Sequence, residues 1–152
     1  MTPDFQSLDT ADTTQIIALW EKCGLVRPWN PPEQDIAHLL AHPTADILVA
    51  KHKGRVKASV AVGYDGHRGW VYYLATDPAQ QGAGLGRAAM KAAEDWLRAR
   101  SVPKIQLMVR ETNKQVTGFY AALGYKDSAV RVYQKWLSED RAGLYAAGRH
   151  DQ

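Results

Sequence analysis

The sequence predicts an α/β (α+β) fold in which helices pack against a mixed, mostly antiparallel central sheet. Apolar runs of strand length alternate with segments of helical periodicity, and Asp65-Gly66 marks a hairpin between two of the runs. No apolar run approaches the length of a membrane span. With 152 residues, of which 45% are hydrophobic and 23% charged, the chain has the size and composition of one globular domain.

The first half of the chain is expected to place strands and helices on either side of one rigid loop. Three prolines between Arg27 and Pro32 exclude a helix there, because proline lacks an amide hydrogen and restricts the residue before it. Asp12 or Thr13 can cap the helix before the loop, and Cys23-Gly24 ends that helix. The expected elements are a strand at 5–8, helices at 11–22 and 33–42, and hairpin-linked strands at 47–52, 56–64 and 70–76.

The second half begins with a long amphipathic helix. Its apolar stripe is expected to comprise Leu85, Ala88, Ala89, Ala92, Trp96 and Leu97. After it we expect a strand at 105–109, a helix at 115–123 ended by Gly124, and a last strand within 125–136, clearest at 129–134. One domain would then span residues 1–137, followed by a polar tail at 138–152 that is frayed or weakly helical.

Three glycines, Gly82, Gly84 and Gly86, open the amphipathic helix, although each glycine in a helical turn costs about 1 kcal/mol relative to alanine. A tight turn that requires positive φ would explain one of them. Glycines at a strand-to-helix junction also leave backbone N–H groups uncovered, and the first four N–H groups of a helix lack an internal acceptor. Together with the helix dipole they form an anion site, so this stretch predicts phosphate binding.

The residues around the glycines limit the kind of phosphate ligand. No Gly-Lys-Ser/Thr follows the loop, which excludes a nucleoside-triphosphate P-loop. Residues 84–89 satisfy the dinucleotide pattern G-x-G-x-x-A, with Glu111 as a candidate ribose-binding acid. This pattern nevertheless follows two hairpins instead of opening the fold. A dinucleotide-binding oxidoreductase is therefore the less favoured alternative.

A second motif, NKQVTGFYAALGY at 113–125, follows the next predicted strand. Together with Gln81 to Gly86 it resembles the GNAT superfamily of acyl-CoA-dependent N-acetyltransferases. The glycine stretch is similar to the family's Gln/Arg-x-x-Gly-x-Gly/Ala pyrophosphate loop. Asn113, followed by Tyr120 and then Leu-Gly-Tyr, is similar to the family's second element. Residues 20–30 and 63–69 further resemble the bacterial YpeA-type acetyltransferases of that superfamily.

The resemblance implies a GNAT fold, with a splayed parallel strand pair in the sheet, about four flanking helices, and acetyl-CoA as the cofactor. The cofactor's pantetheine arm would lie between the two splayed strands, and Asn113 would tie that arm or the splayed backbone. The implied main-chain contacts to pantetheine are Leu74, Ala75 and Thr76. The implied pyrophosphate contacts are Gln81, Gly82, Ala83, Gly84, Leu85, Gly86 and Arg87, the last also through its side chain.

Tyr120 matches the tyrosine general acid of the family. The phenol has an ordinary pKa near 10 and the leaving thiol one near 8.5, so this proton transfer is uphill by about 2 kcal/mol and can accompany C–S cleavage. The alternative is a core tyrosine that only needs a hydrogen-bond partner. The asparagine seven residues earlier favours the catalytic interpretation.

The sequence leaves several candidates for the group that takes a proton from the acceptor amine. No carboxylate lies in the strand at 70–76. Each candidate is otherwise an ordinary surface or turn residue, so our working hypothesis is a chain of water to several groups. The candidates are Glu21, Asp65, His67 and Glu111, with Tyr72 or Tyr73 orienting a water.

The proline-stiffened loop lies where this family builds its acceptor wall. The implied acceptor residues are Arg27, Trp29 and Asn30, together with Tyr72 on the strand. Arg27 would favour an acceptor that carries a carboxylate or a phosphate, and His67 and Arg68 could join it. Alternatively Trp29 fills the core and the prolines only shape a turn.

Composition limits the partners and the compartment. The net charge is +3 and the basic residues are dispersed, so we expect no nucleic-acid partner, and no membrane span is predicted. The single Cys23 cannot form an internal disulfide and fits a reducing cytoplasm. His38 and His42 have a metal-compatible spacing but no third ligand, so we expect no metal.

These observations together predict a cytoplasmic acetyl-CoA-dependent N-acetyltransferase. It would move an acetyl group to a primary amine, on a small molecule or a peptide, by direct attack in a ternary complex. A non-catalytic acyl-CoA-binding or regulatory module of the same fold is the alternative. Edge strands would support a homodimer.

Overall fold

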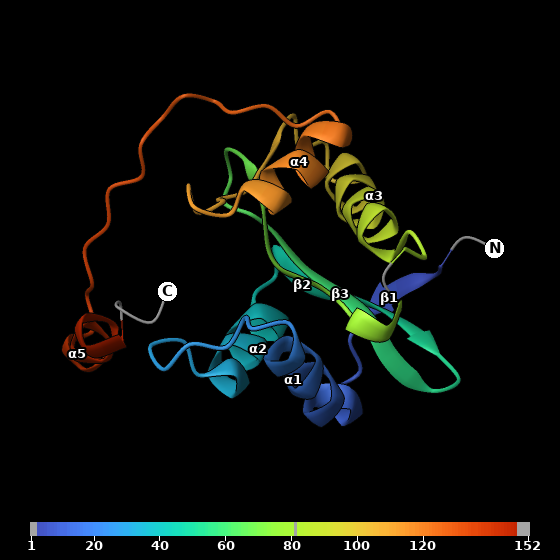
Figure 1. Ribbon diagram of the computed structural model, residues 1–152, viewed down its shortest axis with the longest axis horizontal. Coiled ribbons are helices and arrows are strands. Elements are labelled where there is room, and N and C mark those ends of the chain that lie inside the picture. The colour runs from blue at the N-terminus through green and yellow to red at the C-terminus, as the bar shows by residue number, and fades with distance from the viewer. Residues whose placement is uncertain (1–2, 81, 149–152) are drawn as a thin grey trace. The chain divides into compact units, whose positions relative to one another are not determined.

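The computed structural model of this chain describes residues 3–80 and 82–148. The chain divides into two compact units, Met1–Leu107 and Met108–Gln152. Among the described residues, the first unit contains the β-sheet with the helices α1 to α3, and the second contains α4 and α5 (Figure 1). The predicted division of the chain at residue 137 stays a prediction.

The sheet of the first unit is mixed, as predicted. Its strands follow one another in chain order, β1-β2-β3-β4-β5. The first four are antiparallel neighbours, whereas β5 runs parallel to β4. The strands are β1 (Phe5–Ser7), β2 (Ala45–His52), β3 (Arg55–Tyr64), β4 (Gly69–Thr76) and β5 (Ile105–Gln106).

Helices cover both faces of this sheet. Figure 1 shows α1 (Thr13–Lys22) and α2 (Pro32–Ala41) on one side and α3 (Leu85–Arg98) on the other. Pro32 occupies the first turn of α2, where its missing N–H removes no helical hydrogen bond. The helix therefore begins inside the proline stretch that the sequence assigned to a loop. Short 3₁₀ turns at Thr10–Asp12 and Pro78–Gln80 precede α1 and α3.

The buried face of α3 differs from the predicted stripe by about one residue position. Its buried residues are Ala89, Met90, Ala93 and Leu97. Trp96 is instead half-exposed, with the Arg100 guanidinium 3.5 Å from its ring centre. A side chain on Gly69 would place its Cβ 2.5 Å from a methyl carbon of Leu97. The absence of a side chain there allows α3 to lie close to the start of β4.

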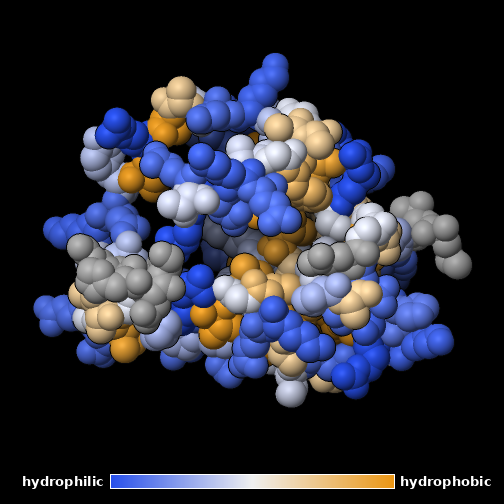
Figure 2. Space-filling model, viewed as in Figure 1, coloured by the Kyte–Doolittle hydropathy of each residue, from blue (hydrophilic) through white to orange (hydrophobic). Residues whose placement is uncertain are grey.

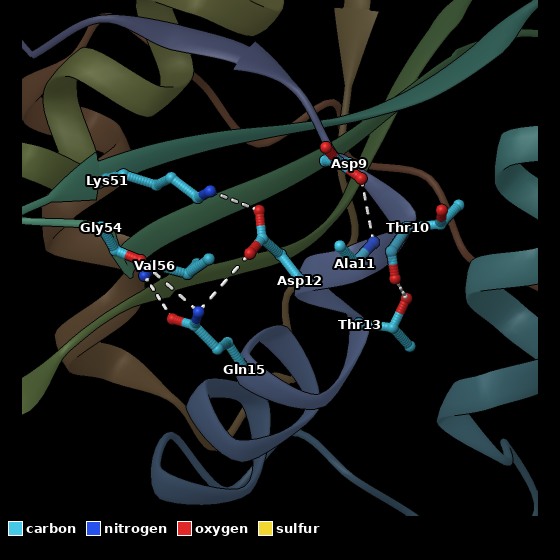
Figure 3. Close-up of polar contacts among 9 residues, drawn as sticks. All are labelled: Asp9, Thr10, Ala11, Asp12, Thr13, Gln15, Lys51, Gly54 and Val56. Atoms are coloured by element: carbon cyan, nitrogen blue, oxygen red, sulfur yellow. Dashed lines mark hydrogen bonds and ion pairs between the residues drawn. The ribbon is translucent and has the colours of Figure 1, made fainter.

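Polar contacts join the start of α1 to the hairpin between β2 and β3 (Figure 3). The expected cap, Asp12, is buried and pairs with Lys51 Nζ instead of capping the helix. Asp9 caps the preceding 3₁₀ turn, where its carboxylate accepts from the Ala11 N–H at 2.9 Å. The Gln15 side chain accepts from the Val56 N–H at 3.0 Å. These contacts fix α1, and with it Trp20, against the sheet.

The second unit contains α4 (Lys114–Ala122) and α5 (Glu139–Gly148). The strand predicted at 129–134 is wrong, because residues 125–137 form neither helix nor strand. Val130 is 70% exposed and Tyr133 is 90% exposed. An alternating apolar pattern becomes a strand only when a neighbouring strand supplies hydrogen bonds and burial. The tail that we expected to be frayed or weakly helical contains α5.

The face of the molecule drawn in Figure 2 is mostly polar. Figure 2 shows hydrophilic side chains over much of the viewed face, with hydrophobic ones in separate patches. Within residues 3–80 and 82–148, no helix has the length and apolar character needed to cross a membrane.

Candidate functional site

One edge of β4 is largely unpaired. The ladder with β5 comprises Gly69 opposite Ile105 and Trp70 opposite Gln106, and it ends there. From Val71 to Thr76 this edge has no ladder partner among the described strands, while the other edge pairs with β3. Its main-chain N–H and C=O groups can therefore pair with an extended ligand. Leu74, Ala75 and Thr76, the predicted pantetheine contacts, all belong to this stretch.

A β-bulge interrupts β4 in the middle of the unpaired stretch. Ala61 pairs with Tyr72 and Ser59 with Ala75, so two residues of β4 lie opposite one of β3. The first of the two, Tyr73, has a φ of 53°. Such a left-handed conformation costs a non-glycine residue about 1–2 kcal/mol. Bulges of this kind redirect side chains and are frequent beside active sites.

Contacts from three elements hold Tyr73 in this conformation. Its ring stacks on Trp20, with ring centres 3.9 Å apart and planes 8° apart. The buried Ser59 Oγ donates to the Tyr73 carbonyl at 3.0 Å and accepts from Trp20 Nε1 at 2.9 Å. The Tyr73 hydroxyl donates to Asp35 Oδ2 at 2.5 Å. Sequence reasoning did not indicate this Asp35 contact, since no local pattern connects α2 to β4.

The turn between β4 and α3 is anchored by Asp77, which is buried at the end of the strand. Its carboxylate accepts from the Ala79 N–H at 3.0 Å and from Lys57 Nζ at 3.2 Å. These contacts, the backbone hydrogen bond first, lower the pKa of Asp77. A fixed turn at this point sets where the glycine segment begins.

The start of α3 has no side-chain cap. Gly82 and Gly84 have φ values of 85° and 76°, so backbone conformation requires two of the three glycines, where we expected it to require one. The first internal bond of the helix runs from the Ala88 N–H to the Gly84 carbonyl, which leaves the N–H groups of residues 85–87 before it. No described atom lies within 4 Å of a Cβ placed on Gly82 or Gly84. Exposed backbone donors and open space therefore coincide, as an anion site requires.

The other predicted pyrophosphate contacts of this segment are Ala83, Leu85, Arg87 and Gln81. Ala83 is exposed and Leu85 half-buried, so the segment lies at the surface. The Arg87 side chain is exposed and has no ion-pair partner among the described residues, which leaves its charge available to a ligand. Gln81, also predicted to bind pyrophosphate, lies outside the described residues.

The second unit contains Asn113 and Tyr120, at the start and in the last turn of α4. The Asn113 side chain caps this helix by accepting from the Val116 N–H at 3.3 Å. The Tyr120 ring lies edge-on to Phe119 and Tyr125, with centres 5.1 and 5.7 Å away. Burial raises the pKa of the Tyr120 phenol, which therefore keeps its proton at neutral pH.

The three residues of the proline-stiffened loop that were predicted to contact the acceptor make contacts within the protein. Arg27 Nη1 donates to the carbonyls of Gly24 and Val26, at 2.7 and 3.0 Å. Trp29 is only 4% exposed. The Asn30 N–H donates to the Arg27 carbonyl at 3.0 Å, which closes the loop. Trp29 is thus buried and the Arg27 guanidinium is bonded within its own loop, while their assignment to the acceptor wall stays a prediction.

Asp65, a candidate base, has a structural role in the turn between β3 and β4. Its carboxylate accepts from the N–H groups of His67 and Arg68, at 2.8 and 2.7 Å, and from Trp70 Nε1 at 3.2 Å. The bonds from Arg68 and His67 contribute most to lowering the pKa of Asp65, so it is a weak base. Partial burial, and then the charge of Asp65, raises the pKa of the half-exposed Tyr72.

Cys23, the candidate glutamates and the two histidines complete the reactive side chains considered in the sequence. Cys23 Sγ donates to the Thr76 carbonyl at 3.2 Å, and burial is the main reason that the pKa of this thiol is raised. A protonated thiol is a poor nucleophile. Glu21 and Glu111 are exposed. Within the described part of the chain, no three His, Cys, Asp or Glu side chains, His38 and His42 included, are grouped so that they could hold a metal ion.

One family model and several solved structures match this chain. The model of the Acetyltransferase (GNAT) family matches residues 10–125. A transcriptional regulator from Bacillus halodurans C-125 has a similar structure, with a TM-score of 0.75 and 17% identity over 88% of this chain and 99% of that one. Glucosamine-6-phosphate N-acetyltransferase from Arabidopsis thaliana has a TM-score of 0.69 and 17% identity over 91% and 100% of the two chains.

A third similar structure is AAC(6')-Iy in complex with the bisubstrate analogue CoA-S-monomethyl-acetylneamine. Its TM-score is 0.73, at 11% identity, over 89% of this chain and 98% of that one. At these identities the three structures establish a common fold.

Proposed function

This chain belongs to the GNAT acetyltransferase family, and from that premise we propose that it transfers the acetyl group of acetyl-CoA to a primary amine by direct attack in a ternary complex. One observation carries the proposal. The first unit combines an unpaired β4 edge from Val71 to Thr76 with an uncapped helix start at Gly84. An extended amide-containing arm and a diphosphate, the two parts of CoA, are what such features bind.

In this proposal bound acetyl-CoA supplies an acetyl group already activated as a thioester. The β4 main chain at Leu74, Ala75 and Thr76 holds the pantetheine arm, and the Cys23 contact leaves the Thr76 carbonyl one remaining lone pair. The N–H groups of residues 85–87 and the Arg87 side chain bind the diphosphate, together with Gln81. Because these amides are fixed before binding, little conformational entropy is lost.

Tyr120 provides the proton that the departing sulfur takes up, and Asn113 ties the cofactor arm or the adjoining backbone. Burial of Tyr120 acts in two directions. It keeps the phenol protonated at neutral pH, as a general acid must be. It also weakens the phenol as an acid, so the transfer costs more than the roughly 2 kcal/mol of ordinary pKa values and must accompany cleavage of the C–S bond.

The acceptor amine must lose a proton before it can attack. For a lysine-like amine this costs about 4.6 kcal/mol at pH 7, and for an α-amine about 1 kcal/mol. Since Asp65 is engaged in its turn, we propose that water passes this proton to solvent. The YpeA-type subgroup and a cytoplasmic location complete the proposal. Their support is the stretches 20–30 and 63–69 and the single cysteine.

Calorimetric titration with CoA and with NADH tests the cofactor proposal. We expect CoA to bind and NADH not to bind. Tight binding of NADH without binding of CoA would favour the dinucleotide alternative and end this proposal. An acetyltransferase must in addition release free thiol from acetyl-CoA when a suitable amine from a library is present.

The Tyr120→Phe variant tests the general acid. We expect kcat to fall by roughly 100-fold or more, with unchanged affinity for CoA, because loss of a general acid typically costs that much. Tyr133→Phe is the matched control, since Tyr133 is 90% exposed in the same unit. Equal turnover of wild type and Tyr120→Phe would remove Tyr120 from the mechanism. CoA binding without turnover of any amine would favour the non-catalytic module.

A further inference from the structure

The main chain of β4 changes its hydrogen-bonding direction between the two ends of the strand. At the start, the Gly69 N–H donates to the Lys104 carbonyl, on the side of β5, at 2.8 Å. Just after the end, the Asp77 N–H donates to the Lys57 carbonyl of β3, also at 2.8 Å. Successive residues of a strand direct their main-chain groups to opposite edges. Gly69 and Asp77 are an even number of positions apart, so in a regular strand both would face the same edge. The alternation is therefore shifted once between them.

The β-bulge at Tyr73 produces this shift. It adds one residue to β4 relative to β3, which moves every later residue by one position in the alternation. Because the Asp77 N–H faces β3, the main-chain groups of Leu74 and Thr76 face the opposite, unpaired edge. These residues are two of the three proposed contacts to the pantetheine arm. Without the bulge, their main-chain groups would face β3 and would not meet a ligand at the unpaired edge.

Ser59 of β3 holds the bulge from inside the sheet. This residue is 0% exposed and lies opposite Ala75, beside the bulge. Its hydroxyl donates to the Tyr73 carbonyl at 3.0 Å and accepts from Trp20 Nε1 at 2.9 Å. A hydroxyl can make both bonds at once. The bond to the Tyr73 carbonyl helps to offset the cost of the left-handed φ of 53° at that residue.

We propose that Ser59 is a positioning residue for the cofactor, an inference that rests on the proposed acetyltransferase function. By holding the bulge, Ser59 directs the main-chain groups of Leu74 and Thr76 to the edge where the pantetheine arm binds. Ser59 is fully buried, so it acts through the β4 main chain and not by contact with the ligand.

The two halves of CoA should depend on Ser59 to different degrees. The diphosphate is assigned to the start of α3, after the turn at Asp77. That turn is held by contacts of its own, from the Ala79 N–H and from Lys57 Nζ to the Asp77 carboxylate. Loss of the Ser59 hydroxyl should therefore weaken binding of the pantetheine arm and spare binding of the nucleotide. A residue that only supports packing would not separate the two.

Calorimetric titration of the full chain with two ligands tests the inference. One ligand is CoA, and the other is adenosine 3′-phosphate 5′-diphosphate, the nucleotide part of CoA without pantetheine. We expect Ser59→Ala to raise the Kd for CoA by about tenfold and to leave the Kd for the nucleotide within about twofold of the wild-type value. Ser59→Cys, which has a similar volume and a weak donor, should show the same selective loss to a smaller degree.

Trp20→Phe is the matched control. It removes the indole donor to Ser59 but leaves the Ser59 hydroxyl its bond to the Tyr73 carbonyl and keeps a ring beside Tyr73. Trp20 is 0% exposed, so we expect Trp20→Phe to lower the Tm at least as much as Ser59→Ala does. Its affinity for CoA should nevertheless stay closer to that of the wild type.

Three results overturn the inference: wild-type affinity for CoA in Ser59→Ala, an equal loss of affinity for CoA and for the nucleotide, or a loss that follows the Tm across the variants. If Ser59→Ala does not fold, the same comparison is made with Ser59→Cys. Failure of the wild type to bind CoA would instead reject the proposed function, so the two failures are distinguishable.

Discussion

Two helices of this protein begin in opposite ways. At the start of α3, Gly84 is in the left-handed conformation and no side chain caps the helix. At the start of α4, the Asn113 side chain accepts a hydrogen bond from the Val116 N–H. Both starts belong to motifs that resemble cofactor elements of the same family. Of these two starts, only that of α3 leaves all its first-turn N–H groups without a side-chain acceptor among the described residues.

The difference bears on how a helix start can serve as an anion site. An N-cap side chain stabilises a helix by about 1 kcal/mol. A helix that begins with glycines forgoes this contribution, and the N–H groups stay hydrated until an anion replaces the water. The α4 start satisfies one of its donors with its own side chain. Asn113 therefore has a structural role whether or not it also contacts a cofactor.

The largest effect is expected from giving α3 the cap that it lacks. In Gly84→Asp, a carboxylate would accept from the first-turn N–H groups and repel the diphosphate. Asp tolerates the left-handed conformation of Gly84 better than most residues do. We expect the Kd for CoA, measured by calorimetry, to rise by roughly 100-fold, because several charge-assisted hydrogen bonds are lost.

Gly84→Asn separates charge from occupancy in this experiment. Asn offers a similar side chain and tolerates the same φ, but it carries no charge. We expect it to weaken CoA binding less than Gly84→Asp does. If Gly84→Asp bound CoA as tightly as the wild type, the diphosphate would not lie at this helix start and the contrast with α4 would have no functional meaning.

A smaller effect is expected from removing the cap that α4 has. Asn113→Ala should destabilise the first turn of α4 by about 1 kcal/mol, and hydrogen exchange of the α4 amides would measure this. Asn113→Ser, which restores a capping oxygen, should recover most of the protection. We expect CoA affinity to change far less than in Gly84→Asp. A loss of CoA affinity as large as that of Gly84→Asp would mean that Asn113 binds the cofactor directly.

Both helix starts could be predicted because their signals are local. Glycines before an amphipathic stripe, and an asparagine before a short helix, determine backbone conformation within a few residues. The strands β2, β3 and β4 were predictable for the same reason, since tight turns join them. The prediction failed where a partner distant in the chain decides the outcome.

The contact from Asp35 to Tyr73 joins residues 38 positions apart, and no pattern in either segment indicates the other. The residues at 129–134 have strand-like alternation, yet they pair with no strand among the described residues. Trp29 suited a binding wall and a core position equally by composition, and burial favours the core position. In each case tertiary contacts, which a local pattern does not contain, determine the result.

The smallest effect concerns Tyr120, the residue by which α4 is proposed to act on the reaction. Burial raises the pKa of its phenol above the ordinary value near 10. The difference in absorbance at 295 nm between wild type and Tyr120→Phe, followed as pH rises, isolates this one phenol. We expect its midpoint to lie above pH 10.

The same shift makes folding stability depend on pH, but only in the alkaline range. Below pH 10 the folded and unfolded chains both keep the Tyr120 proton, so this residue adds no pH dependence. Above pH 10 the unfolded chain releases the proton first, so stability falls until the folded pKa is passed. Tyr120→Phe should lack this part of the alkaline decline. A midpoint at or below 10 would mean that burial does not disfavour the ionised Tyr120 phenol, and Tyr120 would then be no weaker an acid than an ordinary tyrosine.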